Sequence, residues 1–352
     1  MQIDFTKKLL RWNQEQNFRS MPWKNENDPY RIWLSEIILQ QTRVEQGRAY
    51  YEKFIAFFPT ITALAEAPEK EIFKYWQGLG YYTRCRNLIA TAKKITREYQ
   101  GRFPSTYSEI LDLPGIGPYT AAAIASFAFG LPYAVVDGNV ERVLARYFGI
   151  SAPVGFANGK KLYKAIAGEL LDKKNPAMYN QAIMDFGATV CKPRKPLCSG
   201  CVQAKHCQAF QNGWTNSLPR KTVASPRKKR WFYYFIVEAG KNKLWIRERT
   251  AKDIWQNLYE FALWETGQLI PQDQIREIPF FKEYFGKKGF HIRYISPLIH
   301  QTLTHQSITG CFIHLDSALP EFPGYLSVSR KQLRDFPFPK MIADYLTSGP
   351  SL

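Results

Sequence analysis

The stretch Leu113–Gly130, LPGIGPYTAAAIASFAFG, decides how the first half of the chain folds. Gly115 and Gly117 permit a tight turn with φ angles that a side chain would oppose. Pro118 suits a first helical position, and the alanine-rich residues after it predict a helix. The first N–H groups of that helix would be free to bind an anion, such as one DNA backbone phosphate. A plain helix–helix connector is the competing interpretation of a lone G-x-G turn.

The rest of residues 1–212 also has a mainly helical pattern. Apolar residues recur at helical spacing over residues 31–58, with Asp28 as a candidate N-cap and Pro29 at the first helical position. A similar pattern covers residues 69–99. The first half of the chain is therefore predicted to be mainly α-helical.

The character of the chain changes after residue 212. Residues 213–229 lack apolar periodicity, carry prolines and several Lys and Arg, and are predicted to form a basic linker. Beyond them, WFYYFIVEA (231–239) and KLWIRER (243–249) flank a short turn and predict a β-hairpin. The segment PKMIADYL (339–346) predicts a late helix. Residues 230–352 are therefore expected to form a smaller α+β domain.

Length and charge limit the possible functions. The chain has 352 residues, 45% of them hydrophobic, which is enough for two domains with cores of their own. The N-terminus lacks a signal-peptide pattern and no apolar run approaches a membrane span, so a cytoplasmic protein without a membrane partner is expected. The net charge of +18 favours a polyanionic partner such as nucleic acid, although basic residues are often only solvated surface.

Four of the six cysteines lie in CKPRKPLCSGCVQAKHC, between Cys191 and Cys207. In a reducing compartment such a cluster predicts a metal site rather than a disulfide knot. Four thiolates suit either a structural zinc ion or an iron–sulfur cluster, and their spacing alone leaves both open. The predicted ligands are Cys191, Cys198, Cys201 and Cys207.

With these motifs in place, the chain resembles the helix-hairpin-helix superfamily of base-excision DNA glycosylases, and within it the adenine DNA glycosylase (MutY) family. The resemblance rests on LPGIG, on VVDGNVERVLAR (Val135–Arg146), on the C-x6-C-x2-C-x5-C spacing and on WLSEIILQQT (Trp33–Thr42). It extends through RSMPWK, WQGLGYYTRCRNL and NLYEF, and so over nearly the whole chain.

The resemblance implies a detailed architecture. It implies a helix-hairpin-helix glycosylase region over 1–212, with a six-helix barrel at about 25–130. Residues 1–24 with 131–212 would form an iron–sulfur subdomain that holds a [4Fe–4S] cluster. Residues 230–352 would form a Nudix-like domain. Because this domain lacks the carboxylate-rich box of a Nudix pyrophosphatase, it should recognise a lesion rather than hydrolyse a nucleotide.

Release of adenine from its deoxyribose needs one carboxyl group that donates a proton and one carboxylate that stabilises positive charge on the sugar. Glu36 lies on a largely apolar helical stripe, where burial favours its protonated form, although the periodicity alone favours an ordinary surface glutamate. Asp137 precedes a predicted helix and is expected to cap it and stay ionised. The resemblance gives Glu36 the role of acid toward N7 of adenine and Asp137 the role of charge stabiliser. It also places Tyr119 and Asn139 as orienting residues.

DNA contacts are implied at further positions. Lesion recognition by the second domain is implied at a loop that in the family commonly reads Phe-Ser-His and here has Leu303, Thr304 and His305. A hydroxyl that accepts a hydrogen bond detects the N7–H that distinguishes 8-oxoguanine from guanine. For Leu79 an interior packing role is a strong competitor. The DNA-binding candidates are Gln41, Thr42, Leu79, Tyr81, Gly115, Gly117, Thr304 and His305.

The implied function is excision of adenine opposite 8-oxoguanine or guanine in double-stranded DNA, by a monomer that acts on the bacterial nucleoid. Tyr119 stands where the endonuclease III branch has a lysine that forms a Schiff base, so strand cleavage is not expected. Two alternatives remain: a bifunctional pyrimidine glycosylase/lyase on the same fold, and a DNA-damage binder without catalytic activity.

Overall fold

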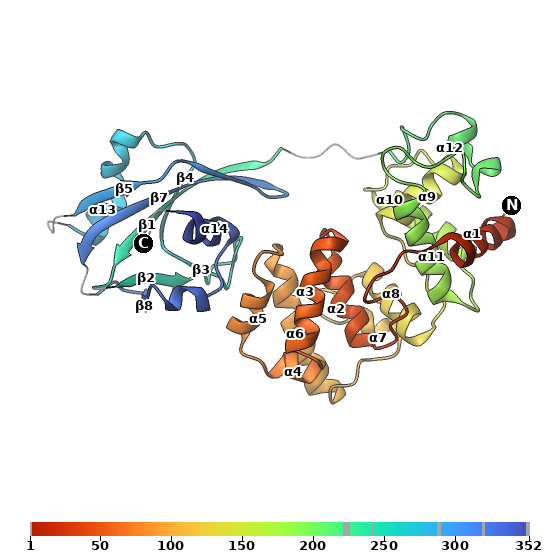
Figure 1. Ribbon diagram of the computed structural model, residues 1–352, viewed down its shortest axis with the longest axis horizontal. Helices are drawn as coiled ribbons and strands as arrows, with labels where there is room; N and C mark the ends of the chain where they lie inside the picture. Colours follow the sequence, from red (N-terminus) through yellow and green to blue (C-terminus); the bar gives the residue numbers. More distant parts are fainter. Residues whose placement is uncertain (1, 221–225, 241, 287–289, 319–320, 350–352) are drawn as a thin grey trace. The chain divides into compact units, whose positions relative to one another are not determined.

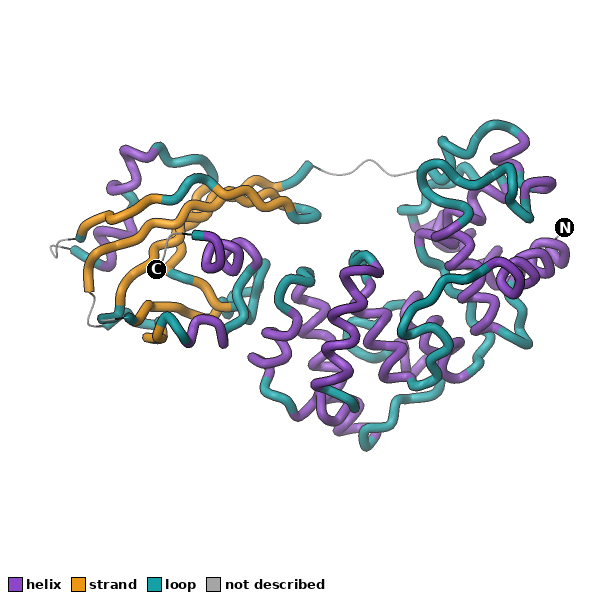
Figure 2. The backbone as a smooth tube through the Cα atoms, in the orientation of Figure 1, coloured by secondary structure: helices purple, strands orange, loops and turns teal. Residues whose placement is uncertain are grey.

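The computed structural model describes residues 2–220, 226–240, 242–286, 290–318 and 321–349. By its internal contacts the chain divides into two compact units, residues 1–66 with 86–223 and residues 67–85 with 224–352. Helices fill the first unit, and all the strands drawn belong to the second (Figure 1, Figure 2). This division differs from the predicted one, which had a single boundary near residue 213. Residues 67–85 group with residues 224–352. For example, Lys74 Nζ donates to the carbonyl of Phe336 over 3.2 Å.

The predicted mainly α first half and α+β second half are confirmed. The helices of the first half are α1 (Gln2–Gln16), α2 (Pro29–Leu39), α3 (Val44–Phe57), α4 (Ile61–Glu66), α5 (Glu69–Trp76), α6 (Tyr82–Tyr99), α7 (Tyr107–Leu111), α8 (Pro118–Phe129), α9 (Gly138–Phe148), α10 (Ala157–Leu170), α11 (Pro176–Thr189) and α12 (Gln208–Gln211). None of the helices within the described ranges is long and apolar enough to cross a membrane.

Two of the continuous helical patterns are interrupted. The first breaks between α2 and α3, where Gln41 has a φ of 58°. The second breaks between α5 and α6, where Gly78, Gly80 and Tyr81 all have positive φ. The start of α2 agrees with the sequence, because the Asp28 side chain accepts from the N–H of Tyr30 over 2.8 Å. Apolar periodicity continues across both breaks and therefore does not reveal them.

A buried core joins the N-terminal helix to helices that lie far from it in sequence. Phe5 and Leu9 of α1 are fully buried against side chains of α9, α10 and α11, such as Tyr147 and Phe186. The Phe5 and Tyr147 rings meet edge to face with their centroids 4.6 Å apart. This packing fixes the start of α9 beside α11, which matters because both contribute to the site described below.

The second half is built on a mixed sheet. Its strands are β1 (Lys228–Glu238), β2 (Lys243–Glu248), β3 (Tyr259–Glu260), β4 (Ala262–Thr266), β5 (His291–Ile295), β6 (Ile299–Thr302), β7 (Gln306–Ala318) and β8 (Leu326–Ser329), with helices α13 (Pro279–Tyr284) and α14 (Lys340–Ser348). The long strands β1 and β7 pair in parallel at the centre. Their outer edges carry antiparallel partners, β4 and β2 on β1, and β6 and β5 on β7. The predicted hairpin of β1 and β2 is present, with Glu238 opposite Leu244.

The predicted basic linker is shorter than residues 213–229. At its start, Leu218 is buried and its carbonyl accepts from Nε of Arg146 over 3.1 Å, so this part packs on the helical half. At its end, Lys228 and Lys229 already lie in β1, paired with β7. Residues 221–225 lie outside the described residues. Polar composition alone did not reveal that both ends of the segment are anchored.

Candidate active site

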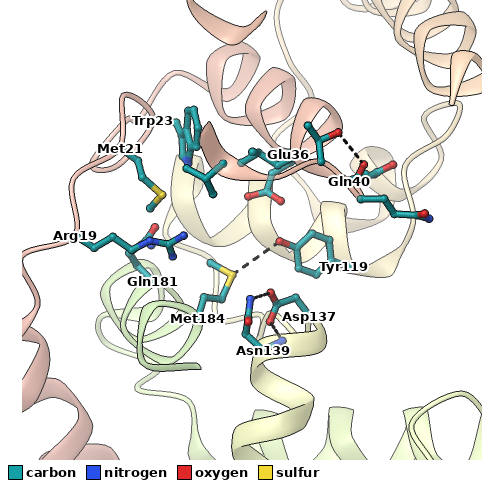
Figure 3. Close-up of a pocket in the computed structure, with 14 residues that line it drawn as sticks. Arg19, Met21, Trp23, Glu36, Gln40, Tyr119, Asp137, Asn139, Gln181 and Met184 are labelled. Atoms are coloured by element: carbon teal, nitrogen blue, oxygen red, sulfur yellow. Dashed lines mark hydrogen bonds between the residues drawn. The ribbon is translucent and has the colours of Figure 1, made fainter. Parts of the chain in front are cut away.

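A cavity of about 330 Å³ lies between residues of α2, α8, α9 and α11 and contains all four predicted catalytic residues (Figure 3). That volume falls in the range of small-molecule sites. It is lined by Arg19, Met21, Trp23, Glu36, Leu39, Gln40, Gln41, Thr42, Val44, Tyr119, Asp137, Asn139, Gln181 and Met184.

The Glu36 carboxyl points from α2 into the cavity (Figure 3). Its pKa is raised to about 7, mainly by burial and also by the nearby negative charge of Asp137. A hydrogen bond with Tyr119 acts in the opposite direction. A large fraction of Glu36 is therefore protonated at neutral pH, which is the condition for a general acid.

The Tyr119 hydroxyl faces Glu36 from the first turn of α8. Burial raises the pKa of this phenol well above its usual value, and the negative charges of Glu36 and Asp137 act in the same direction. Tyr119 therefore stays a neutral hydrogen-bond donor. Its oxygen also lies 3.8 Å from the sulfur of Met184 on α11.

Asp137 caps α9, as the sequence predicts. Its Oδ1 accepts from the backbone N–H groups of Asn139 (2.9 Å) and Val140 (2.8 Å), and its Oδ2 accepts from the side chain of Asn139 (2.6 Å). Burial is the largest influence and raises the pKa of Asp137, and these three donors only partly oppose it.

Asn139 links Asp137 to the cysteine-rich segment. Its Oδ1 accepts from Arg142 Nη2 over 2.8 Å, and the same guanidinium donates to the carbonyls of Gly187 (2.6 Å) and Cys191 (2.8 Å). A chain of hydrogen bonds thus runs from a predicted cluster ligand to the carboxylate in the cavity.

The hairpin before α8 uses only one of its two glycines for an unusual φ. Gly115 has a φ of 73°, and a Cβ there would fall within 2.4–2.7 Å of Asn87. Gly117 has a φ of −96° and open space around a Cβ, so the prediction of an unusual φ at this position is wrong. Gly117 is the N-cap of α8 and has no capping side chain, which leaves N–H groups of the first turn available.

The predicted DNA-contacting residues differ in exposure. Gln41 and Thr42 line the cavity, and Gln41 is exposed. Tyr81 is 43% exposed, whereas Leu79 is only 6% exposed and packs inside, as its competing interpretation held. Insertion of Leu79 into a duplex would require it to leave that environment.

Thr304 and His305 are exposed at the tip of the hairpin between β6 and β7. The turn is closed by the N–H of Leu303, which donates to the carbonyl of Gln306 over 2.8 Å. The Thr304 hydroxyl is hydrogen-bonded to the hydroxyl of Tyr81. Thr304, a predicted lesion-recognition residue, therefore contacts one of the predicted DNA-binding residues, Tyr81.

The four predicted cluster ligands line one small apolar cavity of about 30 Å³. Arg146 Nη1 lies 3.4 Å from the sulfur of Cys191, and the N–H of Gln203 lies 3.4 Å from that of Cys201. Burial raises the pKa of Cys201 to about 11, so a bound cationic group would be needed to hold it as thiolate. Within the described ranges, no three ligating side chains converge where a single metal ion would be held. The four thiols that line one cavity are a donor set that fits either an iron–sulfur cluster or a zinc ion.

Sequence reasoning missed one wall of the cavity. Arg19, Met21 and Trp23 lie in the stretch between α1 and α2, and Gln181 and Met184 lie on α11. The motif RSMPWK carried part of the resemblance, but without regular periodicity nothing indicated which of its side chains reach the site.

Comparisons with known proteins agree with this arrangement. Residues 34–168 match the HhH-GPD superfamily of base excision DNA repair proteins, and residues 233–348 match the NUDIX domain. The structure described as a thermostable thymine-DNA glycosylase superposes with a TM-score of 0.55 at 34% identity, over 60% of this chain and 96% of that one.

Adenine DNA glycosylases are among the similar curated proteins. That of Buchnera aphidicola subsp. Schizaphis graminum is 37% identical over 267 residues, 74% of this chain and 75% of that protein. The human adenine DNA glycosylase is 41% identical over 216 residues, 59% of this chain and 39% of that protein. With a two-unit architecture, a cavity holding Glu36 and Asp137, and these relatives, the chain belongs to the adenine DNA glycosylase family.

Proposed function

We propose that this protein is a DNA N-glycosylase that excises adenine paired with 8-oxoguanine or guanine in duplex DNA. The observation that carries the proposal is the pKa of about 7 at Glu36, in a nucleoside-sized cavity shared with Asp137. One carboxyl group is available as an acid, and a second lies close enough to influence its pKa.

The reaction begins with an adenosine rotated out of the duplex into the cavity. Glu36 donates a proton to N7 of the base, which turns adenine into a better leaving group. As the bond between C1′ and N9 breaks, positive charge grows on the sugar, and the Asp137 carboxylate stabilises it. A water then adds to C1′ and loses a proton, which gives the abasic site. The three N–H donors on Asp137 keep its oxygens in place, and the Tyr119 hydroxyl keeps Glu36 oriented.

Strand cleavage does not form part of this function. The hairpin position that would carry a Schiff-base lysine holds Tyr119, whose neutral phenol cannot form an imine. Release of the base therefore leaves an intact strand with an abasic site that is cleaved only by alkali.

The second domain recognises the partner base. The exposed Thr304 hydroxyl accepts the N7–H that 8-oxoguanine has and guanine lacks, and exposed His305 lies beside it. The domain lacks the carboxylate-rich box of a Nudix pyrophosphatase, and two acidic residues on β3 and β4 are paired with arginine. Glu260 is bonded to Arg247 and Arg249, and Arg230 binds Glu265 over 2.6 Å. The domain therefore serves recognition.

Cys191, Cys198, Cys201 and Cys207 hold a [4Fe–4S] cluster in this proposal. The four cysteines share one cavity, and their C-x6-C-x2-C-x5-C spacing in a glycosylase-like chain supports a polynuclear cluster over zinc. When bound, the cluster supplies a rigid brace and positive charge for four thiolates. Exposed Arg194 and Lys195 in the loop between the first two cysteines are then presented to DNA phosphates. The protein acts as a monomer on chromosomal DNA in the cytoplasm.

One assay tests the proposal. The protein is incubated with duplexes that carry adenine opposite 8-oxoguanine, thymine glycol opposite adenine, or no lesion, and half of each sample is treated with alkali. Cleavage at adenine only after alkali supports the proposal. Direct nicking would favour a bifunctional lyase, and binding without base release would favour a DNA-damage binder.

Thymine removal is a second candidate, because the solved thymine-DNA glycosylase is 34% identical over 60% of the chain. A fourth duplex with thymine opposite guanine separates the two. Since N7 is a purine atom, loss of adenine but not of thymine is expected if Glu36 is the acid.

A further inference from the structure

Asp185 on α11 is a fully buried carboxylate with no place in the reaction described above. It binds residues 17–24, which connect α1 to α2 and are called the strap here. Arg19 Nη1 lies 2.7 Å from Oδ1 of Asp185, and Lys24 Nζ lies 3.2 Å from Oδ2. Asn17 adds a third donor over 2.9 Å. A single carboxylate thus holds both ends of the strap.

The opposite side of the strap forms a wall of the cavity. Arg19, Met21 and Trp23 line it, and the Trp23 ring also meets Tyr51 of α3 edge to face, with centroids 5.4 Å apart. The strap is therefore fixed to α11 on one side and to α3 on the other. Asp185 itself does not line the cavity.

Helix α11, which carries Asp185, also places two other side chains in the site. Gln181 lies one turn before Asp185 and Met184 lies directly before it, and both line the cavity (Figure 3). Met184 contacts the Tyr119 hydroxyl, which in turn orients Glu36. A shift of the strap relative to α11 would therefore change the shape of the cavity around the base.

Charge gives Asp185 a second effect. Arg19 lines the cavity in which the sugar becomes positively charged during the reaction, and Lys24 brings a second positive charge next to Arg19. Asp185 binds both and neutralises part of their field. Lys24 also donates to the carbonyl of Arg19 over 2.9 Å, so the two cations are held as one unit. Without Asp185, the Arg19 guanidinium in the cavity wall would lose this ionic partner.

We infer that Asp185 is a positioning residue for base release: it holds the strap as a fixed wall of the cavity and holds the Arg19 guanidinium in place within that wall. The inference rests on the proposed function. It assigns a role to a residue that touches neither the base nor the sugar.

The test compares Asp185→Asn with the wild-type protein on a duplex with adenine opposite 8-oxoguanine. A misplaced wall is expected to slow single-turnover adenine release by about 100-fold. Affinity for the same duplex with 2′-fluoro-2′-deoxyadenosine, which resists cleavage, should change far less. Hydrogen exchange should speed up in the strap but not in α8 or α9. A merely structural role would loosen the whole unit and lower binding and release together.

A second variant guards against misfolding. Lys24→Met removes one strap-side contact without leaving a bare cation near the cavity, and Lys24 does not line the cavity. It should show a smaller loss with the same pattern. The matched control is Glu15→Gln, which removes an exposed carboxylate of α1 that pairs only with Arg11 among the contacts described. This control should release adenine at the wild-type rate.

The outcomes separate the inference from the proposed function. If wild type and Glu15→Gln fail to release adenine, the proposed function is wrong and the inference is wrong with it. If both release adenine and Asp185→Asn matches them, the inference alone is overturned. If Asp185→Asn does not fold, Lys24→Met decides. The inference is overturned if Lys24→Met releases adenine at the wild-type rate, or if it loses binding and release equally. It is supported if Lys24→Met loses release selectively.

Discussion

The hydroxyl of Tyr119 is hydrogen-bonded to the carboxyl of Glu36, and this contact lowers the pKa of Glu36 while burial raises it. The contact joins α2 and α8, two helices that lie far apart in the sequence. Gln40 and Thr120 support it with a second contact between the same helices, over 3.4 Å. The balance of burial and hydrogen bonding leaves Glu36 with a pKa of about 7.

The first prediction concerns the pH dependence of adenine release. Because Glu36 acts in its protonated form, the apparent second-order rate constant should fall as the pH rises through about 7. In Tyr119→Phe the hydrogen bond that lowers this pKa is lost, so the alkaline limb should move to higher pH. A pH series of single-turnover rates at subsaturating enzyme measures both. An alkaline limb that moves to lower pH in Tyr119→Phe would contradict the assignment.

The second prediction concerns Glu36→Gln. The amide cannot donate the proton, so single-turnover release should disappear while affinity for the mispaired duplex is largely kept. The substitution should also stabilise the fold at alkaline pH. A carboxyl whose pKa is raised from 4.5 to about 7 favours the folded state below pH 4.5 and loses that contribution as the pH rises through 7. The difference is at most about 3 kcal/mol.

Thermal unfolding at pH 5 and pH 8 checks the second half of this prediction. The melting temperature of Glu36→Gln should exceed that of the wild type by more at pH 8 than at pH 5. An equal difference at both values would mean that Glu36 is not buried in the way the structure places it.

Much of the site followed from the sequence. Asp137 was predicted as the cap of the helix that follows it, and capping is a local property of a few consecutive residues. The pKa of Asp137 did not follow, because its burial depends on α8 and α11, which are distant in sequence. The local sequence predicts the hydrogen bonds of Asp137. It does not predict the burial, which has the larger influence on the pKa of this residue.

The breaks at Gln41 and Tyr81 show the same limit. Helical periodicity runs through both, and only tertiary packing forces a left-handed backbone at each. Both residues are candidates for DNA contact. Arg19 and Asp185 were missed for a related reason, since their pairing joins positions 166 residues apart.

The third prediction separates the two roles of Asp137. Asn is also a good helix cap, so Asp137→Asn should keep most of the stability but lose the charge that stabilises the sugar. Asp137→Ala should lose both, with a further cost of about 1 kcal/mol in the free energy of unfolding. Urea unfolding and single-turnover kinetics on the two variants measure this. Substantial activity in Asp137→Asn would show that capping is its main role.

The fourth prediction compares the two hairpin glycines. Gly115→Ala places a side chain at a φ of 73°, which costs about 1–2 kcal/mol for the backbone alone. It also forces Asn87 to move, because the added Cβ would meet it at 2.4 Å. Gly117→Ala meets open space at an ordinary φ, so its stability should hardly change.

DNA affinity distinguishes the hairpin from a plain connector. If the N–H groups at the start of α8 bind a phosphate, Gly115→Ala should weaken binding to any duplex, with or without a lesion, because phosphate contacts carry no sequence information. The salt dependence of binding should become less steep as one phosphate contact is lost. Unchanged affinity and salt dependence in a folded Gly115→Ala protein would identify the turn as a connector between helices.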